Sequence, residues 1–196
     1  MSNVLQLSDK IWITADLHFG HQKDFLWKPR GFSSSEEHDN VIVSNWNNVV
    51  KPNDTVYILG DLMLGNQDHG IEYLNKLNGF KRIILGNHDT ITKITRYSTE
   101  IEHLLAIGYG APLEYKKYRF FLSHYPTLTA NYTNEKHIHN QVINLCGHSH
   151  VKDPFADWNK GIIYHCELDA HNNYPVALDK IIEDIKNKVE NYEKEC

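Results

Sequence analysis

Ile83-Ile84-Leu85-Gly86-Asn87-His88-Asp89 is the segment around which this chain is organised. Its three apolar residues, two of them β-branched, predict a short strand that is buried on both faces. The loop that follows begins with a glycine and then presents an amide, an imidazole and a carboxylate on consecutive positions. Because ligands bind at the carboxyl ends of strands in open α/β sheets, we expect this loop to lie in a functional site.

Four other apolar segments also end in residues that can bind metal ions. The five segments and the polar residues that follow them are 11–15 with Asp16 and His18, 56–59 with Asp61, 83–85 with Asn87, 120–123 with His124, and 143–146 with His148 and His150. In an extended segment, residues two apart point to the same side, so Asp16 and His18 can bind one ion together. The sequence therefore predicts that metal-binding side chains gather at the ends of five strands.

Length and composition predict one domain, which we take to be residues 1–196. Hydrophobic residues make up 41% of the chain. No apolar run approaches the ~18 residues that a membrane-spanning helix needs, and the first ten residues lack the pattern of a signal peptide. We therefore expect a cytoplasmic protein with no membrane partner. The three cysteines have no CxxC spacing, which argues against a disulfide framework and against a thiolate zinc site.

Charge and histidine content separate two classes of function. The formal net charge of -5 argues against an extended nucleic-acid footprint, because binding a polymer needs many contacts from Lys and Arg to phosphates. The 13 histidines are a rich supply of the commonest metal ligand.

The remaining pattern predicts an α/β fold with a second sheet. Ser34 and Glu37 form a capping box for a helix that runs to about Val50. The other expected elements are helices around 71–77 and 99–106, a hairpin over 112–122 that turns at 116–117, a long loop over 125–142, strands at 143–146 and 161–167, and a terminal helix that begins at Asp179. The alternation of strands and helices implies right-handed crossovers and a partly parallel sheet.

The ordered set of motifs resembles that of the calcineurin-like metallophosphoesterases. These motifs are Asp-x-His, Gly-Asp, Gly-Asn-His-Asp, a later His, and Gly-His-x-His, and they span residues 16–150. The segments 122–126 and 172–178 are also similar to small bacterial and phage members. The resemblance implies a four-layer sandwich of two mixed β-sheets flanked by helices.

The resemblance also implies a set of metal ligands. Asp16, His18 and His150 would hold one ion, and Asn87, His124 and His148 would hold a second, with Asp61 bridging both. Carboxylate, amide and imidazole ligands suit manganese, iron or zinc, and of these we expect manganese. Two such ions would share a hydroxide that attacks the phosphorus atom.

His88 and Asp89 are the expected catalytic residues. The resemblance gives His88 the task of stabilising or protonating the leaving group. For Asp89 we expect a hydrogen bond that orients the His88 ring, with the N-cap of the following helix as the alternative.

Four further residues are candidate substrate contacts, and two of them have a structural alternative. His21 follows a glycine turn and could instead be a packed loop histidine. Arg30 could bind a phosphate through two hydrogen bonds or be an ordinary surface arginine. His165 and His171 lie near a strand end and match no motif of the family.

We therefore expect a dinuclear metal-dependent phosphoesterase that acts on small phosphodiesters or phosphomonoesters. The first alternative is a nuclease that acts on DNA or RNA, and the second is a non-catalytic scaffold with a phosphoesterase-like fold. A scaffold would lack His88 or some of the metal ligands, and all of them are present here. A homodimer would be unsurprising.

Overall fold

Two β-sheets form the centre of the computed structural model, which describes residues 8, 10–129 and 138–195. The first sheet has the order β4-β3-β2-β1-β9 and contains β1 (Ile11–Thr14), β2 (Thr55–Leu59), β3 (Phe80–Ile84), β4 (Leu104–Gly108) and β9 (Val176–Ala177). The second sheet has the order β5-β6-β7-β8 and contains β5 (Ala111–Tyr115), β6 (Tyr118–Leu122), β7 (Val142–Cys146) and β8 (Ile163–His165). Each sheet pairs one antiparallel strand, β9 or β5, with parallel ones, so both sheets are mixed.

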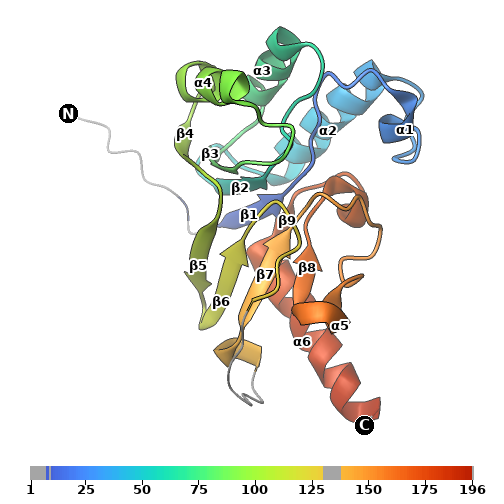
Figure 1. Ribbon diagram of the computed structural model, residues 1–196, viewed down its shortest axis with the longest axis vertical. Coiled ribbons are helices and arrows are strands. Elements are labelled where there is room, and N and C mark those ends of the chain that lie inside the picture. Colours follow the sequence, from blue (N-terminus) through green and yellow to red (C-terminus); the bar gives the residue numbers. More distant parts are fainter. Residues whose placement is uncertain (1–7, 9, 130–137, 196) are drawn as a thin grey trace, which may run out of the picture.

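Helices connect the strands and cover the sheets. They are α1 (Asp24–Trp27), α2 (Ser35–Val49), α3 (Gln67–Asn75), α4 (Ile91–Glu100), α5 (Trp158–Gly161) and α6 (Leu178–Glu195), together with the 3₁₀ turns η1 (Ile138–Asn140) and η2 (Leu168–His171). Figure 1 shows α2, α3 and α4 on one side of the first sheet and the second sheet on the other side. This arrangement confirms the predicted α/β fold of two mixed sheets flanked by helices.

Two hydrophobic clusters hold these layers together. In the first, Ile42 and Trp46 of α2 are fully buried against the first sheet, and the Ser34 side chain accepts a hydrogen bond from the Glu37 amide at the helix start. The second cluster lies between the sheets and contains Ile13, Leu59 and Ile84 from the first sheet, Phe120, Ile143 and Leu145 from the second, and Ile181, Ile182 and Ile185 from α6. Burial of this much apolar surface fixes how the two sheets face each other.

The helix predicted over 99–106 is wrong. Residues 91–100 form α4, and Leu104–Gly108 form β4, an edge strand parallel to β3. Backbone hydrogen bonds to the neighbouring strand explain the difference. The Lys81 amide donates to the His103 carbonyl at 2.9 Å, and the Leu85 amide donates to the Gly108 carbonyl at 2.8 Å. Pairing with β3 outweighs the local preference of the segment.

The strand ends of the two sheets meet at one edge. Beyond β1, the Asp16 and His18 amides donate to the carbonyls of Gly60 and Asp61 at 3.1 and 2.9 Å. In the second sheet, the Gly147 amide donates to the His124 carbonyl at 3.0 Å. Within each sheet, neighbouring loops that carry predicted metal ligands are therefore bonded through their backbones.

No helix among the described residues combines the length and the apolar character needed to cross a bilayer. The long terminal helix, α6, is amphipathic, with Ile181 and Ile185 buried and charged side chains on its outer face.

Lys81 gives a test of this fold. Its fully buried ammonium group donates to the carbonyls of Leu77, Gly79 and Glu102 at 2.9, 3.3 and 3.4 Å, and burial lowers the pKa of Lys81 to about 8. Between pH 8 and the ordinary lysine pKa of about 10.4, the unfolded chain keeps a proton that the folded protein has released, so this residue makes stability rise with pH.

We therefore expect the free energy of unfolding to increase by about 1–2 kcal/mol from pH 8 to 9.5 relative to the Lys81→Met variant, measured by urea denaturation. Lys117→Met, which removes an exposed lysine, is the matched control and should show the wild-type pH dependence. Parallel curves for the wild type and Lys81→Met would contradict the prediction.

Candidate metal centre

Asp61, at the end of β2, is the central residue of the site. Its Oδ1 atom accepts a hydrogen bond from the His88 amide at 2.9 Å. Its Oδ2 atom faces three imidazoles and lies 3.7 Å from His18 Nε2, 3.6 Å from His124 Nε2 and 3.9 Å from His88 Nε2. One carboxylate oxygen is thus held by the backbone, and the other is directed at ring nitrogens on two sides.

Asp16, His18 and His150 lie on one side of Asp61 and form the first ligand group. Asp16 Oδ1 is 3.7 Å from both His18 Nε2 and His150 Nε2, and the two ring nitrogens are 3.3 Å apart. The other oxygen of Asp16 accepts a hydrogen bond from the His148 amide at 2.8 Å. Asp16 therefore repeats the arrangement of Asp61, with one oxygen bound by the backbone and one directed at the ligand group.

Asn87, His124 and His148 lie on the other side and form the second ligand group. Asn87 Oδ1 is 2.8 Å from His124 Nε2 and 3.0 Å from His148 Nδ1, and these ring nitrogens are 3.2 Å apart. His124 Nδ1 donates to the Leu59 carbonyl at 2.9 Å. A neutral His124 then presents the lone pair of Nε2 to the group, as a metal ligand must.

The donor set fits divalent cations. Asp16 Oδ1 is completely buried and has no hydrogen-bond partner among the described residues, although an unpaired buried carboxylate oxygen is costly. The side chains of Asp16, His18 and His150, and those of Asp16, Asp61 and His124, are close enough to share an ion. A cation bound there would satisfy Asp16 Oδ1.

The backbone of the site is strained in a way that supports this fit. Five of the ligand residues have positive φ angles: Asp16 (59°), His18 (50°), Asp61 (55°), His148 (74°) and His150 (51°). Residues other than glycine rarely adopt this conformation, and strained residues of this kind cluster at active sites and ligand-binding loops.

Burial also shifts the titration of the ligands. It raises the pKa of Asp16 and lowers the pKa of His18 and His148, because the charged forms lose their solvent. Burial alone would lower the pKa of His150, but the Asp169 carboxylate and the charge of Asp16 outweigh it and raise that pKa. Neutral His18 and His148 are in the form that binds metal.

Asp89 does not orient the His88 ring as expected. Its Oδ2 atom accepts from the amides of Gly86 and Asp61 at 2.8 and 2.9 Å, and its Oδ1 atom accepts from the Tyr97 hydroxyl at 2.7 Å. It is not the N-cap of α4 either, because Thr90 occupies that position. Asp89 holds the Gly86 loop against the Asp61 loop.

His88 and His21 line a cleft of about 210 Å³ beside the ligand groups. The His88 side chain is 42% exposed. His21 is 6% exposed, and its Nδ1 atom accepts from the Lys23 amide at 3.1 Å. Of the four candidate substrate contacts, only His21 lies in this cleft.

Arg30, His165 and His171 lie elsewhere. Arg30 is not a surface residue: it is 8% exposed and is paired with Asp169 at 2.7 Å, so its guanidinium is bound within the protein. His165 is fully buried between Asp157 and Glu167, and His171 donates to the His165 carbonyl at 2.9 Å. These three placements give no support to a role in substrate contact.

Sequence reasoning missed Asp169 and Lys93. Asp169 lies 2.9 Å from His150 Nδ1, and the ammonium group of Lys93 donates to the His88 carbonyl at 2.7 Å. Asp169 is 19 residues from His150 and Lys93 is five residues from His88, and neither belongs to a motif, so the sequence alone carried no signal for them.

The comparisons with known proteins agree with the geometry. The family model described as calcineurin-like phosphoesterase matches residues 9–193. The uncharacterized protein MJ1445 of Methanocaldococcus jannaschii is 33% identical over 179 residues, which cover 88% of this chain and 89% of the relative. The gene 66 protein of Mycobacterium phage L5 is 43% identical over 82 residues, which cover 40% of this chain and 39% of that protein.

A solved structure has the same fold. The Aquifex aeolicus protein AQ665, whose function its description gives as unknown, superposes with a TM-score of 0.67. The match covers 89% of this chain and 98% of that chain at 21% sequence identity, so it supports the fold alone.

Gly147 gives a test of the close approach at the site. A Cβ atom there would collide with Asp16 Oδ2 and the Ala15 side chain. We therefore expect Gly147→Ala to move Asp16, to cost about 1–3 kcal/mol of stability and to weaken binding of divalent ions, as measured by isothermal titration calorimetry.

Gly108→Ala is the matched control, because the nearest atom to its added carbon would be 3.9 Å away. It should bind metal ions like the wild type. Equal metal affinity in the two variants would show that the close approach of Gly147 to Asp16 does not govern the site.

Proposed function

Because the chain belongs to the calcineurin-like phosphoesterase family, we propose that it hydrolyses small phosphodiesters or phosphomonoesters with the help of two divalent metal ions. The observation that carries the proposal is the position of Asp61 Oδ2 between the first and second ligand groups. A carboxylate so placed can bridge two cations, and each ligand group then adds three donors.

The first ligand group would hold one ion and the second would hold the other. The chemistry that such a pair supplies when bound is the activation of a water molecule and the binding of phosphate oxygens. Manganese is the first ion to test, with iron and zinc as alternatives, because oxygen and imidazole donors suit all three.

His88 is the residue best placed to assist the leaving group. Its ring lines the cleft next to Asp61 Oδ2, and its backbone is held at both ends, by Asp61 at the amide and by Lys93 at the carbonyl. A histidine fixed in this way can donate a proton to the departing oxygen, or hold a hydrogen bond to it.

The cleft favours a small substrate. Its volume of about 210 Å³ is below the range of roughly 300–1,000 Å³ that holds drug-sized ligands. Phe25, Leu26 and Leu64 form an apolar part of the lining of the cleft that the metal ligands share, and Phe25 is 70% exposed. This apolar part would pack against one ring or a short organic group attached to the phosphate.

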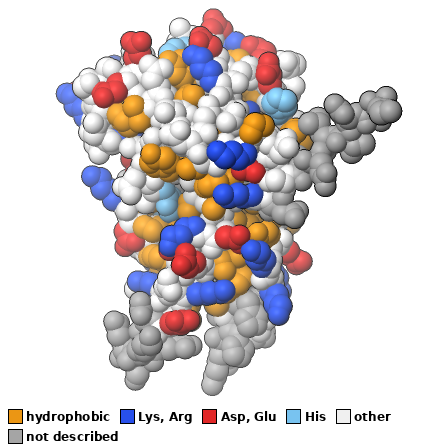
Figure 2. Space-filling view, turned by 180° about the vertical axis from the view of Figure 1, so that it is seen from behind, with side chains coloured by type: hydrophobic (Ala, Val, Ile, Leu, Met, Phe, Trp, Pro, Cys, Tyr) orange, Lys and Arg blue, Asp and Glu red, His pale blue; other side chains and the backbone are white. Residues whose placement is uncertain are grey.

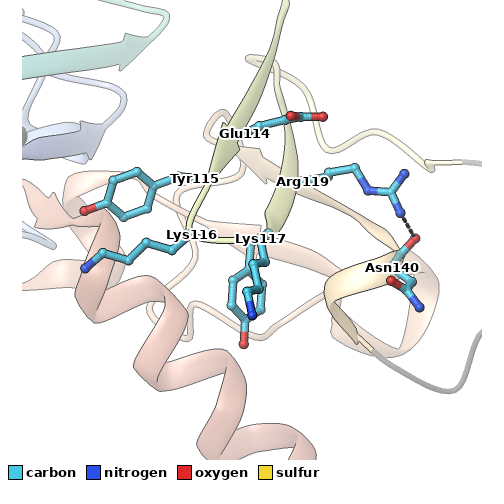
Figure 3. A pocket seen from close by; sticks show the side chains of 7 residues that line it. Glu114, Tyr115, Lys116, Lys117, Arg119 and Asn140 are labelled. Carbon is cyan, nitrogen blue, oxygen red and sulfur yellow. Dashed lines mark hydrogen bonds between the residues drawn. The ribbon is translucent and has the colours of Figure 1, made fainter.

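The described surface offers little to a nucleic-acid polymer. Figure 2 shows basic and acidic side chains intermixed over one face, without a continuous basic stripe. The basic cluster at the β5–β6 turn lines a separate hollow of about 480 Å³, where Lys116 pairs with Asp179 of α6 and Arg119 donates to the Asn140 carbonyl (Figure 3). This turn is at the end of β6 opposite His124, roughly 20 Å away at the rise of a strand. We therefore propose a small phosphoester as substrate, with nucleic acid as the alternative.

Metal dependence tests the proposal. Chelation should abolish hydrolysis of bis-p-nitrophenyl phosphate, and Mn²⁺ should restore it. Asp61→Ala should cause the largest loss of any single ligand variant, because both ions lose a ligand, whereas Asp68→Ala removes an exposed carboxylate on α3 and should leave the rate unchanged.

Full activity in protein shown by elemental analysis to be free of metal would falsify the proposal. The same assays should include single- and double-stranded oligonucleotides over a salt series. If long nucleic acid is cut far more efficiently and with a steep dependence on salt, the nuclease alternative replaces the small substrate.

His88→Asn tests whether His88 assists the departure of the leaving group. The variant should keep its bound metal, since His88 is not among the proposed ligands, but should lose rate by about 10²–10⁴-fold on a substrate with an alkoxide leaving group. The loss should be much smaller for p-nitrophenolate, which leaves without a proton. His103→Asn, at an exposed histidine, is the control; equal losses on both substrates would leave His88 as a phosphate-binding residue only.

A further inference from the structure

Arg30 and Asp169 form a buried ion pair directly behind the first ligand group. Arg30 Nε donates to Asp169 Oδ1 at 3.2 Å, and Nη2 donates to Oδ2 at 2.7 Å. Their side chains are 1% and 9% exposed. The two residues are far apart in sequence, and their segments are also joined by the Asn173 side chain, just after η2, which donates to the Arg30 carbonyl at 3.3 Å.

The pair fixes the orientation of His150. The hydrogens of Arg30 Nη2 are directed to Asp169 Oδ2 and to the Asp16 carbonyl at 2.9 Å. They are therefore not available to His150 Nδ1, which lies 3.3 Å from Nη2, and this ring nitrogen donates its own hydrogen to Asp169 at 2.9 Å. The lone pair of His150 then lies on Nε2, the atom that faces Asp16 Oδ1 and His18.

A second branch anchors the arginine to α2. Arg30 Nη1 donates to His38 Nε2 at 2.9 Å, so His38 must carry its proton on Nδ1, which donates to Asp39 Oδ1 at 2.7 Å. Asp39 Oδ2 in turn accepts from the Gly20 amide at 2.9 Å and from His69 at 2.8 Å. The direction of each hydrogen bond from Arg30 to Asp39 is therefore fixed, because the guanidinium can only donate.

The second ligand group has no such support in the described structure. His124 is oriented by a neutral backbone group, the Leu59 carbonyl, and His148 Nδ1 faces Asn87 and His124. The buried ion pair touches only Asp16 and His150 among the proposed ligands. The two halves of the centre are thus supported differently.

A buried ion pair is weak evidence of a stabilising role. Replacing a buried ion pair by apolar side chains of similar size is often neutral or stabilising, because both charges lose their solvent on burial. A pair that is retained next to a ligand has another use, and carboxylate partners of metal-bound histidines are known to fix the ring and raise its basicity.

We propose that Arg30 and Asp169 are positioning residues that raise divalent-metal affinity in the first ligand group and leave the second unchanged. This inference rests on the proposed function, since it assumes that the centre binds metal. It assigns to Arg30 a structural task in the centre in place of contact with substrate.

The test is calorimetric titration of the metal-free protein with Mn²⁺ and, separately, with Zn²⁺, without substrate. Asp169→Asn should weaken one of the two binding events by about 10–100-fold and leave the other unchanged. Because a lone charge would remain buried in that variant, the double variant Arg30→Met with Asp169→Leu is made as well; it should fold by circular dichroism and show the same selective loss.

Asp157→Asn is the matched control. Asp157 pairs with His165 at 3.1 Å, as Asp169 pairs with His150, but His165 is not a proposed ligand. This variant should bind both ions like the wild type.

A double-mutant cycle shows which half is affected. Adding Asp169→Asn to His150→Ala should cause no further loss of affinity, whereas adding it to His148→Ala should cause the full loss. If the variant that combines Arg30→Met with Asp169→Leu does not fold, Arg30→Lys takes its place. Arg30→Lys keeps the charge but loses the paired hydrogen bonds, and it should weaken the same binding event.

Unchanged binding in folded variants, or equal losses at both sites, would overturn the inference. The proposed function fails separately: a wild-type protein that binds two ions tightly but hydrolyses no phosphoester would leave the inference in place. Wild-type protein that binds no divalent ion would overturn both.

Discussion

The loops that follow β1, β3 and β6 all lie close to Asp61, which follows β2, and the rest of this structure depends on this constraint. Both oxygens of Asp61 are in use, one by the His88 amide and one by imidazoles from β1 and β6, so the strand ends of both sheets must converge on one carboxylate. Glycine makes this convergence possible: a Cβ atom at Gly86 would overlap Asp61 Oδ1, and one at Gly60 would overlap His124. The core between the two sheets keeps the convergence in place, since it sets the distance between β2 and β6.

The site is costly for the folded chain. Positive φ angles, an unpaired buried oxygen on Asp16 and the buried carboxylate of Asp89 all oppose folding. The backbone hydrogen bonds between the loops and the bond from the Tyr97 hydroxyl to Asp89 offset part of this cost. A metal ion that binds the folded state alone would offset more, which couples metal binding to stability. Strain of this kind is expected where geometry serves function and not stability.

Most of the fold could be predicted because its signals are local. Short apolar runs that end in Asp, Asn or His mark the strands and their loops, and the capping residue Ser34 marks the start of α2. The failures come from tertiary contacts, most of them between residues distant in sequence. Pairing with β3 turns residues 104–108 into a strand, the Asp61 amide and Tyr97 capture the Asp89 carboxylate, and Asp169 brings Arg30 under the surface. A side chain can be placed at a strand end from its sequence, but its hydrogen-bond partner cannot.

The ion pair behind His150 differs from a single carboxylate partner. Asp169 alone would add a negative charge near the first ligand group. That charge would strengthen the binding of any cation there. Arg30 at 2.7 Å cancels most of that charge at longer range, so the pair acts on the centre mainly through hydrogen-bond direction. The guanidinium and His150 together hold the pKa of Asp169 well below its ordinary range against the opposing effect of burial, so the carboxylate stays an acceptor at any ordinary pH. What the first ligand group gains is therefore a fixed imidazole tautomer and ring angle, whereas the second group relies on the backbone carbonyl of β2 for the same task.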